Sequence, residues 1–341
     1  MAAAGRHRRA IATGAGLGLV LAATLGVVAA TSSRGHGRAP ACLPFAVSSR
    51  QVRAGARAPR RPVALPDFTH VVVIVMENRE CGQVVGNPRA PFENAMGRRY
   101  ALLPDLYATT HPSFPNYVTL LAGSPLGTKA TCAKCRFRAR NLVDSLEAAH
   151  LSWKAYMEGM PSPCYGPTRA GPYAKRHNPF LFFTDIVTDP RRCARVVPLQ
   201  ALAADERAHA LPRFSWITPS LCDDMHDCDV APGDAFLSRI VPGLLRAVGP
   251  RGAIFVTWDE GTTKRGCCSG RATGGNIPTF VLGGAVRPHA RPLTAYDSLS
   301  ILRTIEDAWR LPRLGQSACS CTPVIADIWR RGLVSARSSG P

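Results

Sequence analysis

The sequence predicts an α/β fold in which a mostly parallel sheet is covered by helices on both faces. Two apolar runs rich in valine and isoleucine, HVVVIVM and AIFVTW, are typical of buried parallel strands. Strands are expected at 70–76, 153–158, 214–218, 253–258 and 277–283. Helical patterns alternate with them, at 114–122, 141–149, 234–247 and 298–309. Such an alternation favours one sheet with helices on either side.

The N-terminal residues 1–30 have the layout of a signal peptide. Arg6, Arg8 and Arg9 precede an uncharged apolar segment at 11–30, and cleavage is expected after Ala30. Twenty such residues could also cross a bilayer, so an uncleaved anchor is the alternative. We therefore expect a secreted protein or, in the alternative, an extracytoplasmic protein held in the membrane.

The rest of the chain divides into three parts. Residues 31–66 are rich in Arg, Ala and Pro without periodicity, which predicts a disordered linker. Residues 67–325 carry the strand and helix patterns and form the expected catalytic domain, and residues 326–341 the C-terminal tail. The length of 341 residues and 46% apolar content suffice for one sizeable core.

The net charge of +19 does not indicate a nucleic-acid partner. Ten of the excess positive charges lie in residues 1–66, which leaves +9 for residues 67–341. Arg outnumbers Lys by 37 to five, which is typical of codon bias rather than of a binding face. We expect a monomer without a nucleic-acid partner, whose remaining field attracts anionic substrates and membrane surfaces.

Twelve cysteines in an exported chain favour disulfides. Cys222 and Cys228 bracket the sequence DDMHD, and a bridge between them would rigidify that loop. The alternative is a zinc site built from Cys132-x-x-Cys135 and the pair Cys267-Cys268. No histidine stands at ligand spacing beside either pair, which favours disulfides.

Oxygen-bearing side chains follow two of the predicted strands. Glu77 and Asn78 come after the first apolar run, and Asp259 and Glu260 after AIFVTW. In open α/β sheets a ligand lies outside the carboxyl ends of the strands. Two adjacent pairs of hard oxygen ligands are more than strand ends ordinarily carry, so we predict that these four residues hold a divalent metal of unknown identity.

Ser113 is the candidate nucleophile. It stands in HPSFPNY, directly before a helical pattern, where it could simply cap the helix. The same place puts its hydroxyl at the positive end of the helix dipole, where a phosphate also binds. A serine needs a base or a metal to ionise, and the four predicted ligands would hold such a metal beside it.

Histidines beside these segments are candidates for proton transfer. His226 lies in LCDDMHDC after the predicted strand 214–218, and His111 lies two residues before Ser113. Histidine is the usual proton donor near neutral pH. We assign catalytic roles to both and phosphate binding to Asn116 and Asp224. The acidic loop could instead be a solvated turn.

The segments MENREC, THPSFPNYVTLLAG, CDDMHDC, TWDEG, IPTFVLG and SILRTIEDAW resemble the motif series of the bacterial phosphoesterase family. That family includes secreted acid phosphatases, a phosphatidylinositol-3-phosphatase and phospholipases C, and it is related to alkaline phosphatases. The resemblance implies an alkaline-phosphatase-like fold, Ser113 as nucleophile, and metal positions at Glu77, Asn78, Asp259 and Glu260. Ser298 stands where family members often carry a histidine.

The expected activity is hydrolysis of phosphate monoesters, with a phosphoinositide at a membrane surface as a candidate substrate. A phospholipase C-type phosphodiesterase is the alternative within the family. From another class, the alternative is a non-catalytic polyanion-binding protein on a phosphatase scaffold. The basic and aromatic excursion at 159–200 is expected to lie over the active-site face and suits an anionic interface, or its aromatic residues belong to the core instead.

Overall fold

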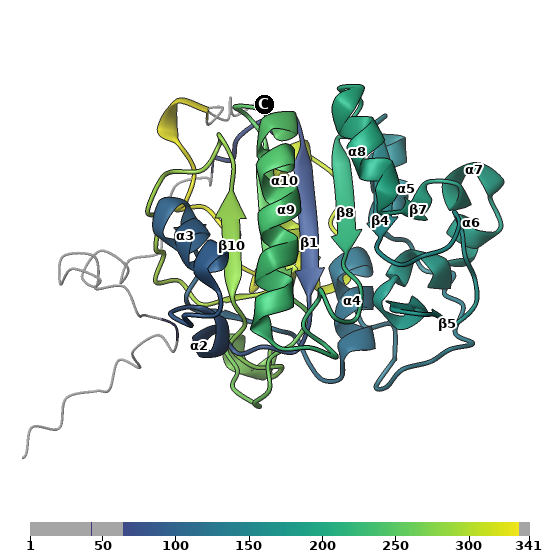
Figure 1. The fold of residues 1–341 in the computed structure, drawn as a ribbon, viewed down its shortest axis with the longest axis horizontal. Coiled ribbons are helices and arrows are strands. Elements are labelled where there is room, and N and C mark those ends of the chain that lie inside the picture. Colours follow the sequence, from purple (N-terminus) through teal and green to yellow (C-terminus); the bar gives the residue numbers. More distant parts are fainter. Residues whose placement is uncertain (1–41, 43–63, 334–341) are drawn as a thin grey trace, which may run out of the picture. The chain divides into compact units, whose positions relative to one another are not determined.

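The computed structural model describes Cys42 and residues 64–333. The predicted signal peptide, nearly all of the predicted linker, and residues 334–341 of the predicted tail lie outside these residues. Within them a seven-stranded sheet runs in the order β2-β10-β9-β1-β8-β4-β7 (Figure 1). No helix of the described residues is both long and apolar enough to cross a membrane.

The sheet strands are β1 (Val71–Met76), β2 (Ala101–Leu102), β4 (Trp153–Met157), β7 (Val196–Pro198), β8 (Phe214–Thr218), β9 (Ala253–Trp258) and β10 (Thr279–Leu282). Two small two-stranded sheets pair β3 (Leu106–Tyr107) with β11 (Tyr296–Asp297), and β5 (Arg169–Ala170) with β6 (Tyr173–Ala174). The α-helices are α2 (Cys81–Val84), α3 (Pro91–Arg99), α4 (Ser113–Ala122), α5 (Leu142–Ala148), α6 (Thr184–Val187), α7 (Pro190–Cys193), α8 (Gln200–Arg207), α9 (Val230–Val248) and α10 (Ser298–Trp309). Short 3₁₀ turns are η1 (Lys175–His177), η2 (Pro179–Phe182), η3 (Cys268–Gly270), η4 (Gly315–Ala318) and η5 (Arg331–Leu333).

Strand direction confirms the predicted class. The neighbours β9, β1, β8, β4 and β7 are parallel, whereas β10 is antiparallel to both β9 and β2. All five predicted strands form, and every residue of β1, β8, β9 and β10 is buried. The two outermost strands, β2 and β7, were not predicted. β7 lies inside the predicted excursion and adds an edge strand to the sheet.

Helices pack on both faces of the sheet, as predicted. The long helix α9 is seen between β10 and β1 in Figure 1, and it contacts β9, α3 and α8. The apolar helices α4 and α10 contact each other in a second group. Every residue of α4 is buried, and so are the first nine residues of α10. The site described below therefore rests on elements that are held by packing rather than on free loops.

The packed core extends on both sides of the predicted catalytic domain. Cys42, inside the predicted linker, is buried and forms a disulfide with Cys81. Ile328 and Trp329, inside the predicted tail, are buried as well, and the Trp329 ring meets Phe68 with centroids 5.0 Å apart.

A buried carboxyl group ties α10 to the turn that follows it. Glu306 accepts hydrogen bonds from the Leu314 amide at 2.9 Å and the Ser317 hydroxyl at 2.5 Å. The same turn abuts the end of α4 at Gly123, which has φ +69°. A Cβ there would meet the Leu314 carbonyl oxygen at 2.0 Å, so only glycine fits.

We expect Glu306→Gln to stabilise the protein at alkaline pH. Burial raises the pKa of Glu306 from 4.5 to about 7. A raised pKa contributes stability that is complete below the unfolded value and is lost as pH rises toward 7. The loss amounts to roughly 3 kcal/mol, which the neutral amide avoids. Urea unfolding from pH 4.5 to 8 should show a flatter stability profile for Glu306→Gln. Parallel profiles for the two proteins would refute the assignment.

Candidate active site

The register of two parallel strands brings the predicted carboxylates together. β1 and β9 pair so that Met76 lies opposite Trp258. The residues that follow, Glu77 and Asp259, therefore leave neighbouring strand ends at the same edge of the sheet. The Asn78 amide donates to Asp259 Oδ1 at 3.2 Å. Asn78 itself has φ 51°, a left-handed conformation that asparagine tolerates better than most residues.

Ser113 faces this carboxylate pair from the first position of α4. Its side chain is buried, and its Oγ lies 2.9 Å from Glu77 Oε2 and 3.1 Å from Glu260 Oε1. A hydroxyl carries one hydrogen and can donate to only one of these oxygens. The second contact needs either a protonated carboxyl or a cation beside the oxygens. The arrangement is therefore suited to removing the serine proton.

His111 is held between two acceptors. Its Nδ1 lies 2.5 Å from Glu260 Oε2, and its Nε2 lies 2.9 Å from the Thr263 carbonyl oxygen. The Thr263 carbonyl oxygen can only accept, so Nε2 carries a hydrogen. These two contacts hold the His111 ring against Glu260, which in turn contacts Ser113.

The loop after β8 supplies Asp224 and His226. The Glu77 amide donates to the Asp224 carbonyl oxygen at 2.8 Å, and the His226 amide donates to Asp224 Oδ1 at 2.7 Å. The His226 Nδ1 lies 2.6 Å from Asp227 Oδ1, and its Nε2 lies 3.1 Å from Arg176 Nη2. Arginine can only donate, so Nε2 is the unprotonated nitrogen in this arrangement.

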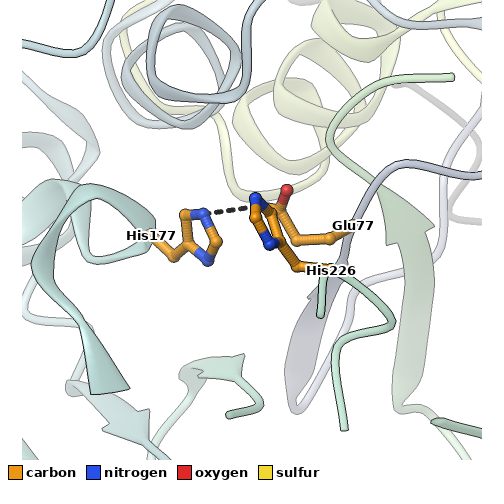
Figure 2. Close-up of side chains that lie close together, drawn as sticks. All are labelled: Glu77, His177 and His226. Carbon is orange, nitrogen blue, oxygen red and sulfur yellow. Dashed lines mark ion pairs between the residues drawn. The ribbon is translucent and has the colours of Figure 1, made fainter. Parts of the chain in front are cut away.

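His177 belongs to the same site and was not predicted. It is 2% exposed and stacks on the Tyr117 ring with centroids 5.3 Å apart. Its Nδ1 lies 3.2 Å from Asp224 Oδ2. Its Nε2 lies 3.2 Å from Glu77 Oε1, and Figure 2 shows these two side chains facing each other. In the sequence it stands among Lys175, Arg176 and Asn178 with no acidic neighbour, so nothing local singles it out.

Mutual repulsion and burial shift the titration of these groups. Burial, then Asp224, raises the pKa of Glu77 well above its usual value. Burial, then Glu77, does the same to Asp259. Burial raises the pKa of Asp224 to about 8. Burial, then Arg176, lowers the pKa of His177 well below its usual value. The site thus concentrates the buried acids Glu77, Asp224 and Asp259.

The donor set fits a divalent metal. Three buried atoms lack a hydrogen-bond partner: Glu77 Oε1, His177 Nε2 and Asp259 Oδ2. The 3.2 Å approach of His177 to Glu77 is close enough for an ion pair but lacks hydrogen-bond geometry. Glu77, His177 and His226 each offer a ligand atom, and these atoms lie within 4.8 Å of one another. Carboxylate and imidazole together suit ions such as Zn²⁺ or Mn²⁺, and a bound cation would reverse the raised pKa values.

Asn116 uses its side chain on the protein itself. Its Oδ1 accepts the Thr110 amide at 3.0 Å, and its Nδ2 donates to the Thr110 carbonyl oxygen at 2.7 Å. These contacts hold the turn that carries His111 and Ser113. The phosphate-binding roles given to Asn116 and Asp224 stay predictions, since both residues are fully buried and engaged with neighbouring protein groups.

Comparison with known proteins places the chain in a family. The profile of the phosphoesterase family matches residues 87–312. The chain belongs to the phosphoesterase family. A phosphatidylinositol-3-phosphatase of Mycobacterium tuberculosis is 34% identical over 273 residues, covering 78% of this chain and 84% of the relative. A phosphate-repressible acid phosphatase of Penicillium chrysogenum is 27% identical, covering 74% of this chain. The chain spans 61% of that relative and of an Aspergillus niger acid phosphatase.

Solved structures share the phosphoesterase's fold. The lipoteichoic acid synthase LtaP of Listeria monocytogenes has a TM-score of 0.52 at 9% identity, covering 77% of this chain and 78% of that one. A Bacteroides thetaiotaomicron protein of glycosaminoglycan metabolism also has a TM-score of 0.52, at 12% identity, covering 76% of this chain and 81% of that one. The predicted fold class, a mostly parallel sheet covered by helices, is confirmed, and identities this low bear on the fold alone.

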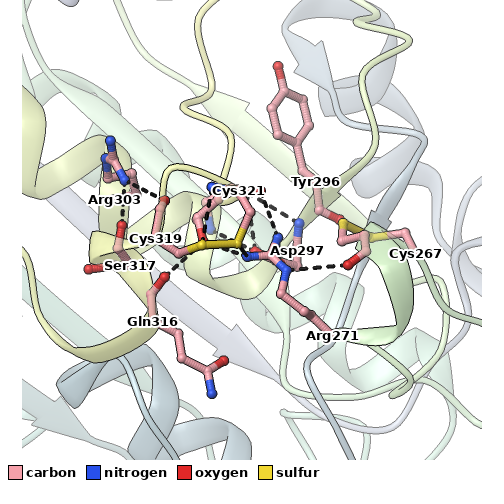
Figure 3. Close-up of polar contacts among 12 residues, drawn as sticks. Cys267, Arg271, Tyr296, Asp297, Arg303, Gln316, Ser317, Cys319 and Cys321 are labelled. Carbon is pink, nitrogen blue, oxygen red and sulfur yellow. Dashed lines mark hydrogen bonds and ion pairs between the residues drawn. A yellow bond between two sulfur atoms is a disulfide. The ribbon is translucent and has the colours of Figure 1, made fainter.

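The loop after Glu260 in this phosphoesterase is anchored by one arginine. Arg271 donates to Asp297 Oδ2 at 3.0 Å, to the Cys321 carbonyl oxygen at 2.9 Å and to Thr322 Oγ1 at 2.9 Å (Figure 3). The loop carries Thr263, whose carbonyl oxygen positions His111. Arg271 thereby connects the catalytic edge to the C-terminal segment around the Cys319–Cys321 disulfide.

All twelve cysteines are paired in disulfides, as the sequence predicted. The alternative of a zinc site is wrong, because Cys132 bonds to Cys135 and Cys267 to Cys268. The predicted bridge between Cys222 and Cys228 is present and closes the loop around His226. Arg79 donates to the Cys228 carbonyl oxygen at 2.7 Å and ties this loop to the segment after β1.

Removing the Cys222–Cys228 bridge should harm catalysis more than stability. Closing so short a loop is worth only about 2 kcal/mol of chain entropy. The double substitution of both cysteines by serine frees the backbone that places His226, so we expect kcat to fall about tenfold or more. Cys164 and Cys193 span 29 residues, and the same double substitution there serves as the control. Loss of this second disulfide should lower the stability more, and kcat less, than loss of the Cys222–Cys228 disulfide. A larger loss of kcat in the Cys164 and Cys193 variant than in the Cys222 and Cys228 variant would contradict a positioning role for the Cys222–Cys228 disulfide.

Proposed function

We propose that this phosphoesterase is an exported phosphatase that hydrolyses phosphate monoesters through Ser113 and a divalent metal. The observation that carries the proposal is the contact of the Ser113 hydroxyl with Glu77 and Glu260 at the N-terminus of α4. The enzyme class, a phosphoric monoester hydrolase, is confirmed by the family and by relatives named for phosphatase activity.

The nucleophilic step uses groups already in contact. Ser113 Oγ attacks phosphorus in line, and Glu77 or Glu260 accepts its proton. The free backbone amides at the start of α4 face the phosphoryl oxygens and stabilise their charge. The bond to the leaving alcohol breaks, and a phosphoserine forms at Ser113. Water then attacks the phosphoserine and releases inorganic phosphate.

The metal would be held by Glu77, Asn78, Asp259 and Glu260, as the sequence predicts. The structure adds His177 as a candidate ligand through its unpartnered Nε2. Such an ion supplies Lewis-acid polarisation of the phosphoryl oxygens and makes the serine hydroxyl more acidic.

Proton transfer to the leaving alcohol falls to His226 or to water. In the present arrangement Arg176 donates to His226 Nε2, so this nitrogen holds no proton to give. A phosphate dianion is a stronger acceptor for a guanidinium than a neutral imidazole. Phosphate binding would therefore draw Arg176 away and free His226 Nε2 to take up and transfer a proton. His111 keeps Glu260 in position throughout.

Substrate and location extend the proposal. The relative named phosphatidylinositol-3-phosphatase makes a phosphoinositide the leading candidate substrate. Six disulfides that pair every cysteine support function in an oxidising compartment outside the cytoplasm.

The proposal is tested on purified protein with p-nitrophenyl phosphate and bis-p-nitrophenyl phosphate. We expect kcat/KM to be at least about a hundredfold higher for the monoester, because Ser113 and the α4 amides form a site for a dianion. Comparable or higher kcat/KM on the diester would favour the phospholipase C-type alternative. Turnover of neither compound, together with tight polyphosphate binding, would favour the non-catalytic alternative.

A further inference from the structure

A cation without a counter-ion lies beside the catalytic edge. Lys175 is 3% exposed, and no ion pair to it is found among residues 64–333. Its Nζ lies 4.7 Å from the centroid of the Phe182 ring, a cation–π contact. Lysine is almost never buried to this extent unless it is paired with an acid. The feature therefore needs an explanation outside the folding of the core.

A second cation accompanies Lys175. Arg136 is exposed, makes one hydrogen bond to the Cys135 carbonyl oxygen and forms no ion pair among the described residues. Arg136 precedes Phe137, which forms a β-bridge with Phe183, the residue after the Phe182 that Lys175 covers. Two like charges kept together without an acid are unfavourable until an anion joins them.

The loop that carries Arg136 is fixed in place. The Cys132–Cys135 disulfide closes it, and the Phe137 amide donates to the Phe182 carbonyl oxygen at 2.8 Å. The Thr184 amide donates in turn to the Phe137 carbonyl oxygen at 2.8 Å. Arg136 therefore stands on a backbone segment docked at the end of η2, where the Phe182 ring meets the Lys175 amine.

Two independent paths connect Lys175 to the catalytic residues. Lys175 opens the 3₁₀ turn η1, which ends at His177, and His177 contacts Glu77. The Phe182 ring beneath the Lys175 amine lies 4.6 Å, centroid to centroid, from the ring of Phe114, the residue after Ser113. Lys175 thus belongs to a turn that packs against α4, the helix that begins at Ser113.

We propose that Lys175 and Arg136 form a subsite for a second phosphate on the substrate. This inference rests on the proposed function and narrows it to phosphomonoesters whose alcohol carries a further phosphate, either a monoester or a diester. The phosphoryl group that is hydrolysed sits at Ser113. The second phosphate supplies the anion that the buried ammonium and the guanidinium lack. Each charge-assisted contact of this kind is worth about tenfold in affinity.

The test compares three soluble substrates. These are inositol 3-phosphate, inositol 1,3-bisphosphate, whose second phosphate is a monoester, and glycerophosphoinositol 3-phosphate, whose second phosphate is a diester. We expect kcat/KM to be at least about tenfold higher for one or both doubly phosphorylated compounds than for inositol 3-phosphate. The compound with the larger gain identifies the form of the second phosphate.

Variants link the gain to the subsite. Lys175→Met keeps an apolar stem over Phe182 and removes the charge, and it should reduce the substrate ratio to near one. Arg136→Gln, on the exposed loop, should reduce the ratio severalfold and serves if Lys175→Met does not fold. Lys134→Met removes one charge from the same loop at an exposed position and is the matched control, with an unchanged ratio.

Three outcomes would overturn the subsite. They are equal kcat/KM on all three compounds, a ratio that survives both Lys175→Met and Arg136→Gln, and an equal loss of the ratio in Lys134→Met. The last would assign the preference to the general positive field. In each of these cases hydrolysis of inositol 3-phosphate leaves the proposed function standing. Absence of turnover on every compound would count against the proposed function itself.

Discussion

Ser113→Ala should lower kcat by about a thousandfold or more while the fold is kept. Removing a nucleophile leaves only the catalysis provided by binding and electrostatic stabilisation. The side chain is buried, but its hydroxyl contacts carboxylate oxygens rather than the apolar core, so truncation leaves little cavity. The measurement is steady-state hydrolysis of p-nitrophenyl phosphate, with circular dichroism and thermal unfolding as checks on the fold. Rapid acid quench should also trap a phosphoserine in the wild-type protein and none in Ser113→Ala.

Ser298 provides a matched control. It too is a buried serine at the first position of a helix, α10, but its Oγ has no hydrogen-bond partner among the described residues. Ser298→Ala should therefore retain nearly all activity. A Ser113→Ala protein that kept more than about a tenth of wild-type kcat would show that Ser113 only caps the helix.

The strands that the sequence predicted are those whose composition identifies them without tertiary information. β1 consists of apolar residues and β9 of apolar residues apart from Thr257, because both faces of a parallel sheet are covered. β2 and β7 have two and three residues, too few for any periodicity to show. β7 forms because its backbone pairs with β4, a contact that depends on how the excursion folds back.

The same distinction applies to the site. Glu77 and Asp259 were predictable neighbours because they directly follow parallel strands in matching register. His177 lies 100 residues after Glu77 in the chain and reaches it only through the placement of η1. The state of His226 depends on Arg176, another residue of the excursion. Local sequence thus predicts which groups stand at strand ends, whereas groups delivered by long excursions are found only in the folded chain.

Removal of the metal should abolish activity reversibly. Purified protein is expected to contain about one divalent ion per chain, since Glu77 and Asp259 are buried acids with unpartnered oxygens that an ion would satisfy. Dialysis against a chelator should lower kcat by at least about a thousandfold, because the ion polarises the phosphoryl group. Zn²⁺, Mn²⁺, Mg²⁺ and Ca²⁺ are then added back separately. A requirement for Zn²⁺ or Mn²⁺ would support an imidazole ligand such as His177, whereas Mg²⁺ or Ca²⁺ would favour oxygen ligands alone.

Substitutions locate the ion. Asp259→Asn keeps the size of the side chain but removes the charge, and it should lose the metal together with the activity.

Glu93 is the matched control, because it is a buried carboxyl outside the site whose two oxygens also lack a hydrogen-bond partner. Burial, then Asp234, raises the pKa of Glu93 well above its usual value, as burial and Glu77 do for Asp259. Glu93→Gln should nevertheless keep one ion and full activity, since Glu93 belongs to α3 and not to the ends of β1 and β9 where the site lies. If Glu93→Gln lost the ion and Asp259→Asn retained it, the metal site would lie at the contact between α3 and α9 instead. A fully active protein without metal after exhaustive chelation would leave Glu77 and Glu260 as general bases only.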